Sequence, residues 1–81
     1  ALPSGSTYID LVVTLDGKPE TIKASCILYG ASQDLKCGLL STEGDGITHH
    51  IRVTFPVKIT SSTQMTVTCG RKKATLTLSV N

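Results

Sequence analysis

Residues 63–78 read TQMTVTCGRKKATLTL, and apolar and polar side chains alternate on both sides of a central glycine. A period of two is the pattern of a β-strand with one buried face, and it does not fit the apolar stripe of a helix. The polar run Gly70-Arg71-Lys72-Lys73 separates the two alternating halves. The segment therefore predicts an antiparallel hairpin near the end of the chain.

The same alternation recurs through most of the sequence. The runs cover residues 8–15, 21–28, 36–41 and 47–55, and residues 57–59 continue the pattern after Pro56, which ends or bends its strand. Asp16-Gly17-Lys18-Pro19 is a turn signal, so we expect the first two runs to form a hairpin with each other. Residues 31–35 are predicted to form a loop, or at most one helical turn.

Length and composition indicate one globular domain. The chain has 81 residues, of which 40% are hydrophobic and 17% charged. Six or seven short strands in one flat sheet would leave the apolar face wet, so they predict an all-β fold, a two-layer antiparallel β-sandwich. A small β-barrel is the alternative. We expect residues 1–6 to be a flexible N-terminal tail and residues 7–81 to form the domain.

Three cysteines give the small core a possible covalent support. Cys26 and Cys69 are in phase with the inward residues of their strands, which predicts a disulfide across the core. It would close a loop of about 43 residues and contribute roughly 3–4 kcal/mol. Cys37 would then be a free or intermolecular thiol. Two alternatives stay open: a bond between Cys37 and Cys69, or three unbridged cysteines that act as small buried hydrophobes.

One cysteine in the second strand and another before the last hairpin form an arrangement that resembles an immunoglobulin-like sandwich at the level of the fold. The sequence departs from that pattern because it has no tryptophan to pack on the bridge and no tyrosine shortly before Cys69.

Composition also argues against several functions. A formal charge of +2 is too small for a surface that neutralises many phosphates, which argues against a nucleic-acid reader. No apolar run approaches the roughly 18–20 residues that span a bilayer, so we expect no membrane span. Only Tyr8, Tyr29 and Phe55 are aromatic, too few for a stacking platform. No nucleophile motif or spaced pair of carboxylates is present, and we predict neither enzymatic activity nor a cofactor.

His49 and His50 are the one pair that invites a catalytic or metal-binding interpretation. Adjacent residues of a strand point to opposite faces, so the two imidazoles cannot chelate one ion. We expect one histidine to face the core beside Ile47 and Ile51 and the other to face solvent, and we predict no metal site.

Two short segments are the candidates for contact with a partner. Turns are the usual places for recognition residues, and the candidates are Arg71, Lys72 and Lys73 in the last turn, with Asp45, His49 and His50 around an earlier one. Val12 and Ile27 are apolar residues out of phase with their strands. If those strands form a hairpin, the two side chains would form one exposed apolar patch or a dimer contact.

The chain begins at Ala1 without methionine, and its cysteines fit an oxidising compartment, so we expect a secreted protein in an extracellular or periplasmic location. Our leading hypothesis is a non-enzymatic domain that binds a protein partner through strand edges and turns. One alternative is an inhibitor or toxin-like effector that acts on a target enzyme or cell. Another is a structural subunit of a surface assembly, a homodimer or larger, held by edge strands or by Cys37.

Overall fold

The computed structural model describes residues 2–81. It contains six strands and one short 3-10 helix, which confirms the predicted all-β class. In chain order the elements are β1 (Ser6–Thr14), η1 (Pro19–Thr21), β2 (Ile22–Leu28), β3 (Ala31–Thr42), β4 (Thr48–Ile59), β5 (Thr63–Cys69) and β6 (Lys72–Leu78).

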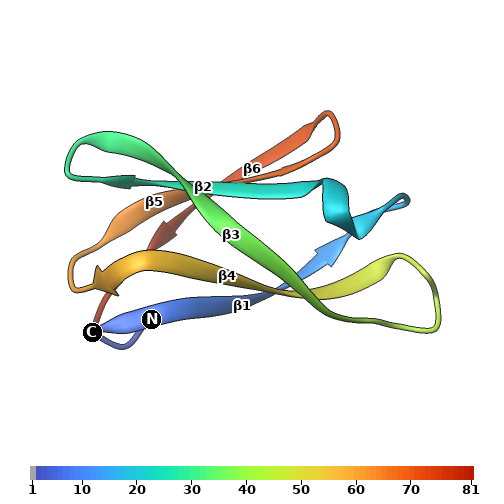
Figure 1. Ribbon diagram of the computed structural model, residues 1–81, viewed down its shortest axis with the longest axis horizontal. Coiled ribbons are helices and arrows are strands. Elements are labelled where there is room, and N and C mark those ends of the chain that lie inside the picture. Colours follow the sequence, from blue (N-terminus) through green and yellow to red (C-terminus); the bar gives the residue numbers. More distant parts are fainter. Residues whose placement is uncertain (1) are drawn as a thin grey trace.

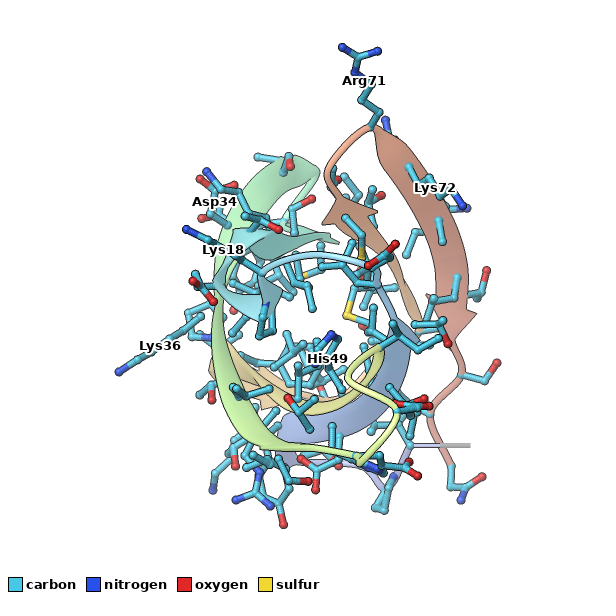
Figure 2. The ribbon with its side chains drawn as sticks, turned by 90° about the vertical axis from the view of Figure 1, so that its right-hand side faces the viewer. Lys18, Asp34, Lys36, His49, Arg71 and Lys72 are labelled. Atoms are coloured by element: carbon cyan, nitrogen blue, oxygen red, sulfur yellow. The ribbon has the colours of Figure 1, made fainter. Side chains whose placement is uncertain are left out.

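The strands form one sheet in the order β1-β4-β3-β2-β5-β6, with every neighbouring pair antiparallel (Figure 1). β3 pairs with β2 through its first residues and with β4 through its later ones, so the sheet bends around this long strand. Viewed from its end, the sheet curls around the core as a half-barrel (Figure 2). The strands thus enclose the core from two sides, as in the predicted sandwich, and they do so in one continuous curled sheet, a half-barrel that is consistent with the small-barrel alternative.

The core lies on the concave side of the curled sheet, and the alternate, inward-facing residues of the strands form it. His49 is the one buried polar residue among the described residues. The buried hydrophobic residues are Ile22, Ala24, Cys26, Leu35, Ile51, Val53, Phe55, Ile59, Met65, Val67 and Leu78.

The predicted hairpin at residues 63–78 is confirmed. Cys69 pairs with Lys72 across a turn of two residues, and Gly70 has a φ of 62°. Glycine at the first central position of such a turn matches the twist of the flanking strands.

The expected pairing of the first two strands is wrong. β1 pairs with β4, and β2 lies between β3 and β5. The turn signal at residues 16–19 shows that the chain changes direction there, but η1 then carries it to another part of the sheet. Val12 and Ile27 are both exposed, as predicted, yet they lie on strands that are not neighbours and therefore do not form one patch.

Residues 31–35, predicted as a loop, are the beginning of β3. They form a hairpin with β2 in which Leu28 pairs with Ala31 across Tyr29-Gly30. Both turn residues have positive φ, 53° and 77°, as in a type I′ turn. The usual sequence there is Asn-Gly or Asp-Gly, so a tyrosine at the first position concealed the turn.

The N-terminal segment belongs to the fold from residue 2. The amide of Leu2 donates to the carbonyl of Ser79 (2.7 Å), and the amide of Asn81 donates to the carbonyl of Leu2 (3.0 Å). A turn at Pro3–Ser6 then leads into β1. Hydrogen bonds therefore fix residues 2–6 in the fold, which corrects the expected flexible tail. The first residue of that tail, Ala1, lies outside the described residues.

Candidate binding site

The two edges of the sheet, β1 and β6, approach each other but do not pair along their length. Within residues 2–81, β1 forms a ladder only with β4, and β6 only with β5. In the described part of the chain, the one connection across the opening is the parallel bridge between Leu2 and Val80, at the end where the chain termini lie (Figure 1). We call the remaining opening between β1 and β6 the seam.

The seam contains an apolar groove of about 410 Å³. Its inward side chains, such as Leu11, Val13 and Leu76, are only partly buried, whereas Ile51 and Met65 on inner strands are completely covered. Solvent therefore reaches one side of the core through the seam. The lining residues are Leu11, Val12, Val13, Thr14, Val67, Cys69, Lys72, Lys73, Ala74 and Leu76.

The backbone of β1 presents free hydrogen-bonding groups to the seam. The amide of Leu15 donates to the carbonyl of Ile47 (2.8 Å), which places the odd-numbered residues of β1 in bonds to β4. Hydrogen-bonding direction alternates along a strand, so Asp10, Val12 and Thr14 direct their amide and carbonyl groups to the open side.

β6 presents the matching edge. Lys72 faces Cys69 across the two-residue turn, which places the even-numbered residues of β6 in bonds to β5. Lys73, Thr75 and Thr77 therefore direct their backbone groups to the seam. Ser79 follows the same alternation, and its carbonyl accepts the hydrogen bond from the Leu2 amide.

Positive charge gathers where β6 begins. Arg71 projects from the hairpin tip, and Lys72 lies on the adjoining strand (Figure 2). Lys72 and Lys73 line the groove. Neither these lysines nor Arg71 has a carboxylate within 4.0 Å in the described part of the chain. The predicted Arg71–Lys73 site thus coincides with one end of the groove.

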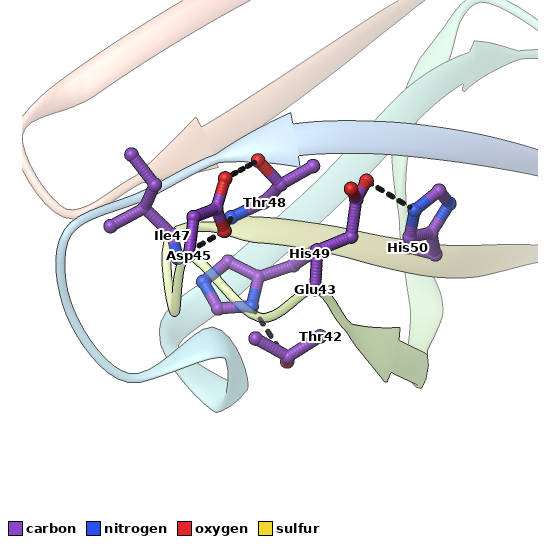
Figure 3. Close-up of polar contacts among 7 residues, drawn as sticks. All are labelled: Thr42, Glu43, Asp45, Ile47, Thr48, His49 and His50. Atoms are coloured by element: carbon purple, nitrogen blue, oxygen red, sulfur yellow. Dashed lines mark hydrogen bonds and ion pairs between the residues drawn. The ribbon is translucent and has the colours of Figure 1, made fainter.

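Asp45, in the second predicted contact region, stabilises the turn in which it lies. Its Oδ1 accepts hydrogen bonds from the amides of Ile47 and Thr48 (both 2.9 Å), and its Oδ2 accepts one from the Thr48 hydroxyl (2.6 Å, Figure 3). The Thr48 hydroxyl and these two amides hold the pKa of Asp45 below its usual value. The hydrogen bonds of this carboxylate therefore stabilise the turn of the β3–β4 hairpin.

The two histidines face opposite sides, as predicted. His49 is 1% exposed, so it is not available to a partner, which corrects that part of the prediction. Its Nε2–H donates to the carbonyl of Leu15 (3.0 Å), and its Nδ1 accepts from the hydroxyl of Thr42 (2.9 Å). His50 is half-exposed and contacts Glu43 (2.9 Å, Figure 3).

The three cysteines are free, and the predicted disulfide is absent. Cys26 pairs with Met65 and Cys69 pairs with Ile22, so Cys26 and Cys69 lie on neighbouring strands, four residues out of register. Four residues correspond to about 14 Å along a strand, well beyond the roughly 7 Å limit for a disulfide. The immunoglobulin-like bridge therefore does not form. Cys37 lies on β3, separated from Cys69 on β5 by the intervening strand β2.

The sequence does not predict the groove, because the groove depends on which strands become the two edges of the sheet. The available signal was Val12, an apolar residue at an outward position, which is 63% exposed beside the seam. Alternation showed that Val12 was unusual, but only the strand order shows what it borders.

Residues 2–81 hold no group of three or more histidine, cysteine or acidic residues that could hold a metal ion. Among them there is also no helix of the length and apolar character that crossing a membrane requires. Comparison of the chain with protein-family models, with curated proteins and with solved structures gives no match.

Proposed function

We propose that this chain is a non-enzymatic binding domain that holds an extended segment of a protein partner in the seam between β1 and β6. The observation that carries the proposal is the pair of strand edges on either side of an apolar groove. An extended peptide satisfies such edges through its backbone and places alternate side chains in the groove. The predicted extracellular or periplasmic location stays a prediction.

The fold supports this mode of binding because a segment of the chain already uses it. Leu2 bonds to Ser79 and Asn81 on the β6 side and begins to close the seam. Natural proteins usually protect exposed strand edges, since unpaired backbone groups attract other strands. Among the residues that line the groove, only Lys72 and Lys73 at one end are charged and none is a proline, so the edges at residues 11–14 and 74–76 lack such protection.

The test uses random seven-residue peptides, the length of β6, displayed on phage and selected on the folded protein. Val12→Pro removes one edge amide from β1, and Val12→Thr keeps that amide as the matched control. Thr75→Pro makes the same change on β6. We expect selected peptides to lose affinity by about tenfold with each proline variant and to shield Cys69 from alkylation.

Circular dichroism of each variant shows whether the sheet is retained. The proposal is overturned if the selection gives no binders, or if the binders ignore both proline variants and leave Cys69 equally reactive.

Tyr29 favours a second candidate function, the inhibitor-like one. Its side chain is 92% exposed at the tip of the β2–β3 hairpin, and its φ of 53° is rare for a bulky residue. Strained residues that the surrounding structure holds in place are common at functional sites. An exposed hairpin tip that carries an aromatic ring suits insertion into the cleft of a target enzyme, and loss of inhibition with Tyr29→Ala is the corresponding test.

A further inference from the structure

We propose that the captured segment enters the seam parallel to β6 and antiparallel to β1, with an acidic side chain near its N-terminal end, beside Lys72 and Lys73. This inference rests on the function proposed above, and it defines the chemistry of the partner. Three features of the seam carry it: the direction of Leu2, the alternation of side chains along the groove, and the uncompensated positive charge at one end.

The direction follows from the order of the strands. Every neighbouring pair in the sheet is antiparallel, so the two edges of a six-stranded sheet run in opposite directions. A single strand between them must be parallel to one edge and antiparallel to the other. Leu2 already occupies this position in the sense parallel to β6, through its bridge to Val80. A segment in line with Leu2 pairs with the free edge of β1 in the antiparallel sense, which is the more stable pairing.

The side-chain pattern follows from the groove. Its inner wall presents Leu11, Val13 and Leu76, with Val67 at the buried floor. The inward side chains of a bound strand would therefore be apolar and would cover the exposed side of the core. The alternate side chains would point outward, level with Val12 and Thr75, where polar or β-branched residues fit.

The position of the acidic residue follows from the charge. Lys72 begins β6, so the N-terminal end of a strand parallel to β6 lies beside it. Lys72 and Lys73 line the groove, and no acidic residue lines it with them. A carboxylate there would gain an oppositely charged neighbour, whereas a basic residue would face two like charges. The expected pattern, from N to C, is one acidic residue followed by alternating polar and apolar residues.

The test reads the sequences of the peptides selected above. We expect aspartate or glutamate to be enriched in the first two positions. For the tightest peptide, synthesis in reversed order and replacement of its acid by lysine should each weaken binding, on the order of tenfold for the charge change. The protein variant Lys72→Glu leaves Lys73 in place, so the opposed charges should abolish the preference for the acidic peptide over the lysine peptide. Lys36→Glu, an exposed lysine on β3, is the matched control (Figure 2).

The inference is overturned if selected peptides carry no N-terminal acid, or if forward and reversed peptides bind equally. If binding in that case is still weakened by Val12→Pro, the proposed function stands. If Val12→Pro binds the peptides equally well, the inference and the proposed function are both overturned. Light scattering distinguishes a further outcome, in which the protein dimerises through the seam and peptides fail to compete. That outcome would replace the peptide by a second copy and would overturn the inference.

Discussion

Leu2 and Val80 form a parallel bridge that joins the two ends of the chain across the opening of the sheet. The bridge has two backbone hydrogen bonds, from the Leu2 amide to Ser79 and from the Asn81 amide to Leu2. It closes one end of the seam and leaves the groove open beyond it. The termini therefore contribute to the stability of the half-barrel and mark the direction of a strand that would complete it.

Leu2→Pro tests the contribution of this bridge. Proline removes the amide that donates to Ser79, and one such bond is worth about 1 kcal/mol, or roughly 5 °C in melting temperature for a domain of this size. Leu2→Ala retains the amide and separates the loss of the side chain from the loss of the bond. Hydrogen exchange of the Asn81 amide should also become faster in Leu2→Pro. Unchanged melting and unchanged exchange would show that the bridge contributes nothing.

Tyr29→Asn should stabilise the protein. A bulky residue at positive φ costs about 1 kcal/mol, and asparagine accepts this conformation readily in a type I′ turn. Thermal unfolding should show an increase of a few degrees. Tyr29→Phe keeps the same backbone strain and is the control. A lower melting temperature for Tyr29→Asn would mean that the ring makes a stabilising contact despite its exposure.

His49→Leu should be strongly destabilising. The leucine would leave the carbonyl of Leu15 and the hydroxyl of Thr42 without their imidazole partner, and an unsatisfied buried group costs about 1–3 kcal/mol. His50→Gln is the control, because a surface contact of this type is worth less than about 1 kcal/mol. Urea denaturation measures both variants. Equal midpoints for the two would contradict a structural role for His49.

The Asp45 turn predicts a loss of stability in acid. Its hydrogen bonds hold the pKa of the folded carboxyl below the unfolded value, so its contribution is complete above about pH 5 and is lost as the pH falls through the folded pKa. Asp45→Asn cannot accept the Thr48 hydroxyl in the same way and should be less stable at pH 7. The difference from the parent should shrink toward pH 2. Denaturation at several pH values tests this, and Asp34→Asn on the exposed side of β3 is the control.

A difference between parent and Asp45→Asn that stays constant from pH 7 to pH 2 would exclude this linkage. The salt bridge between Asp10 and Arg52 should act in the same direction, because the guanidinium lowers the pKa of that carboxyl.

The free cysteines predict an order of reactivity in the folded protein. Cys69 lines the groove and should alkylate first. Cys26 is 2% exposed and should react last, because burial hides the thiol and raises its pKa. Burial also raises the pKa of Cys37. Intact mass after alkylation under unfolding, non-reducing conditions should show three modified thiols, and a mass lower by two hydrogens with one modified thiol would restore a disulfide.

The sequence by itself determined the β-strands and the faces they present. Period-two alternation placed β5, β6 and most of β4, and it predicted that one of the two adjacent histidines faces the core, as the buried His49 does beside the half-exposed His50. These properties are local, because side-chain direction in a strand depends only on the parity of the residue. The basic turn at Arg71–Lys73 was identified for the same reason, since a glycine between two alternating runs fixes where the hairpin ends.

The tertiary structure alone decided which strands become neighbours. The turn at residues 16–19 gave no indication that β1 would pair with β4, because pairing depends on contacts between residues far apart in the chain. The alternation of side chains in each strand predicted that Cys26 and Cys69 face the same core. Only the register of the paired strands shows that they lie too far apart to form a disulfide. The groove has the same origin: β1 and β6 become edges when the sheet curls, and the curl stops before they meet.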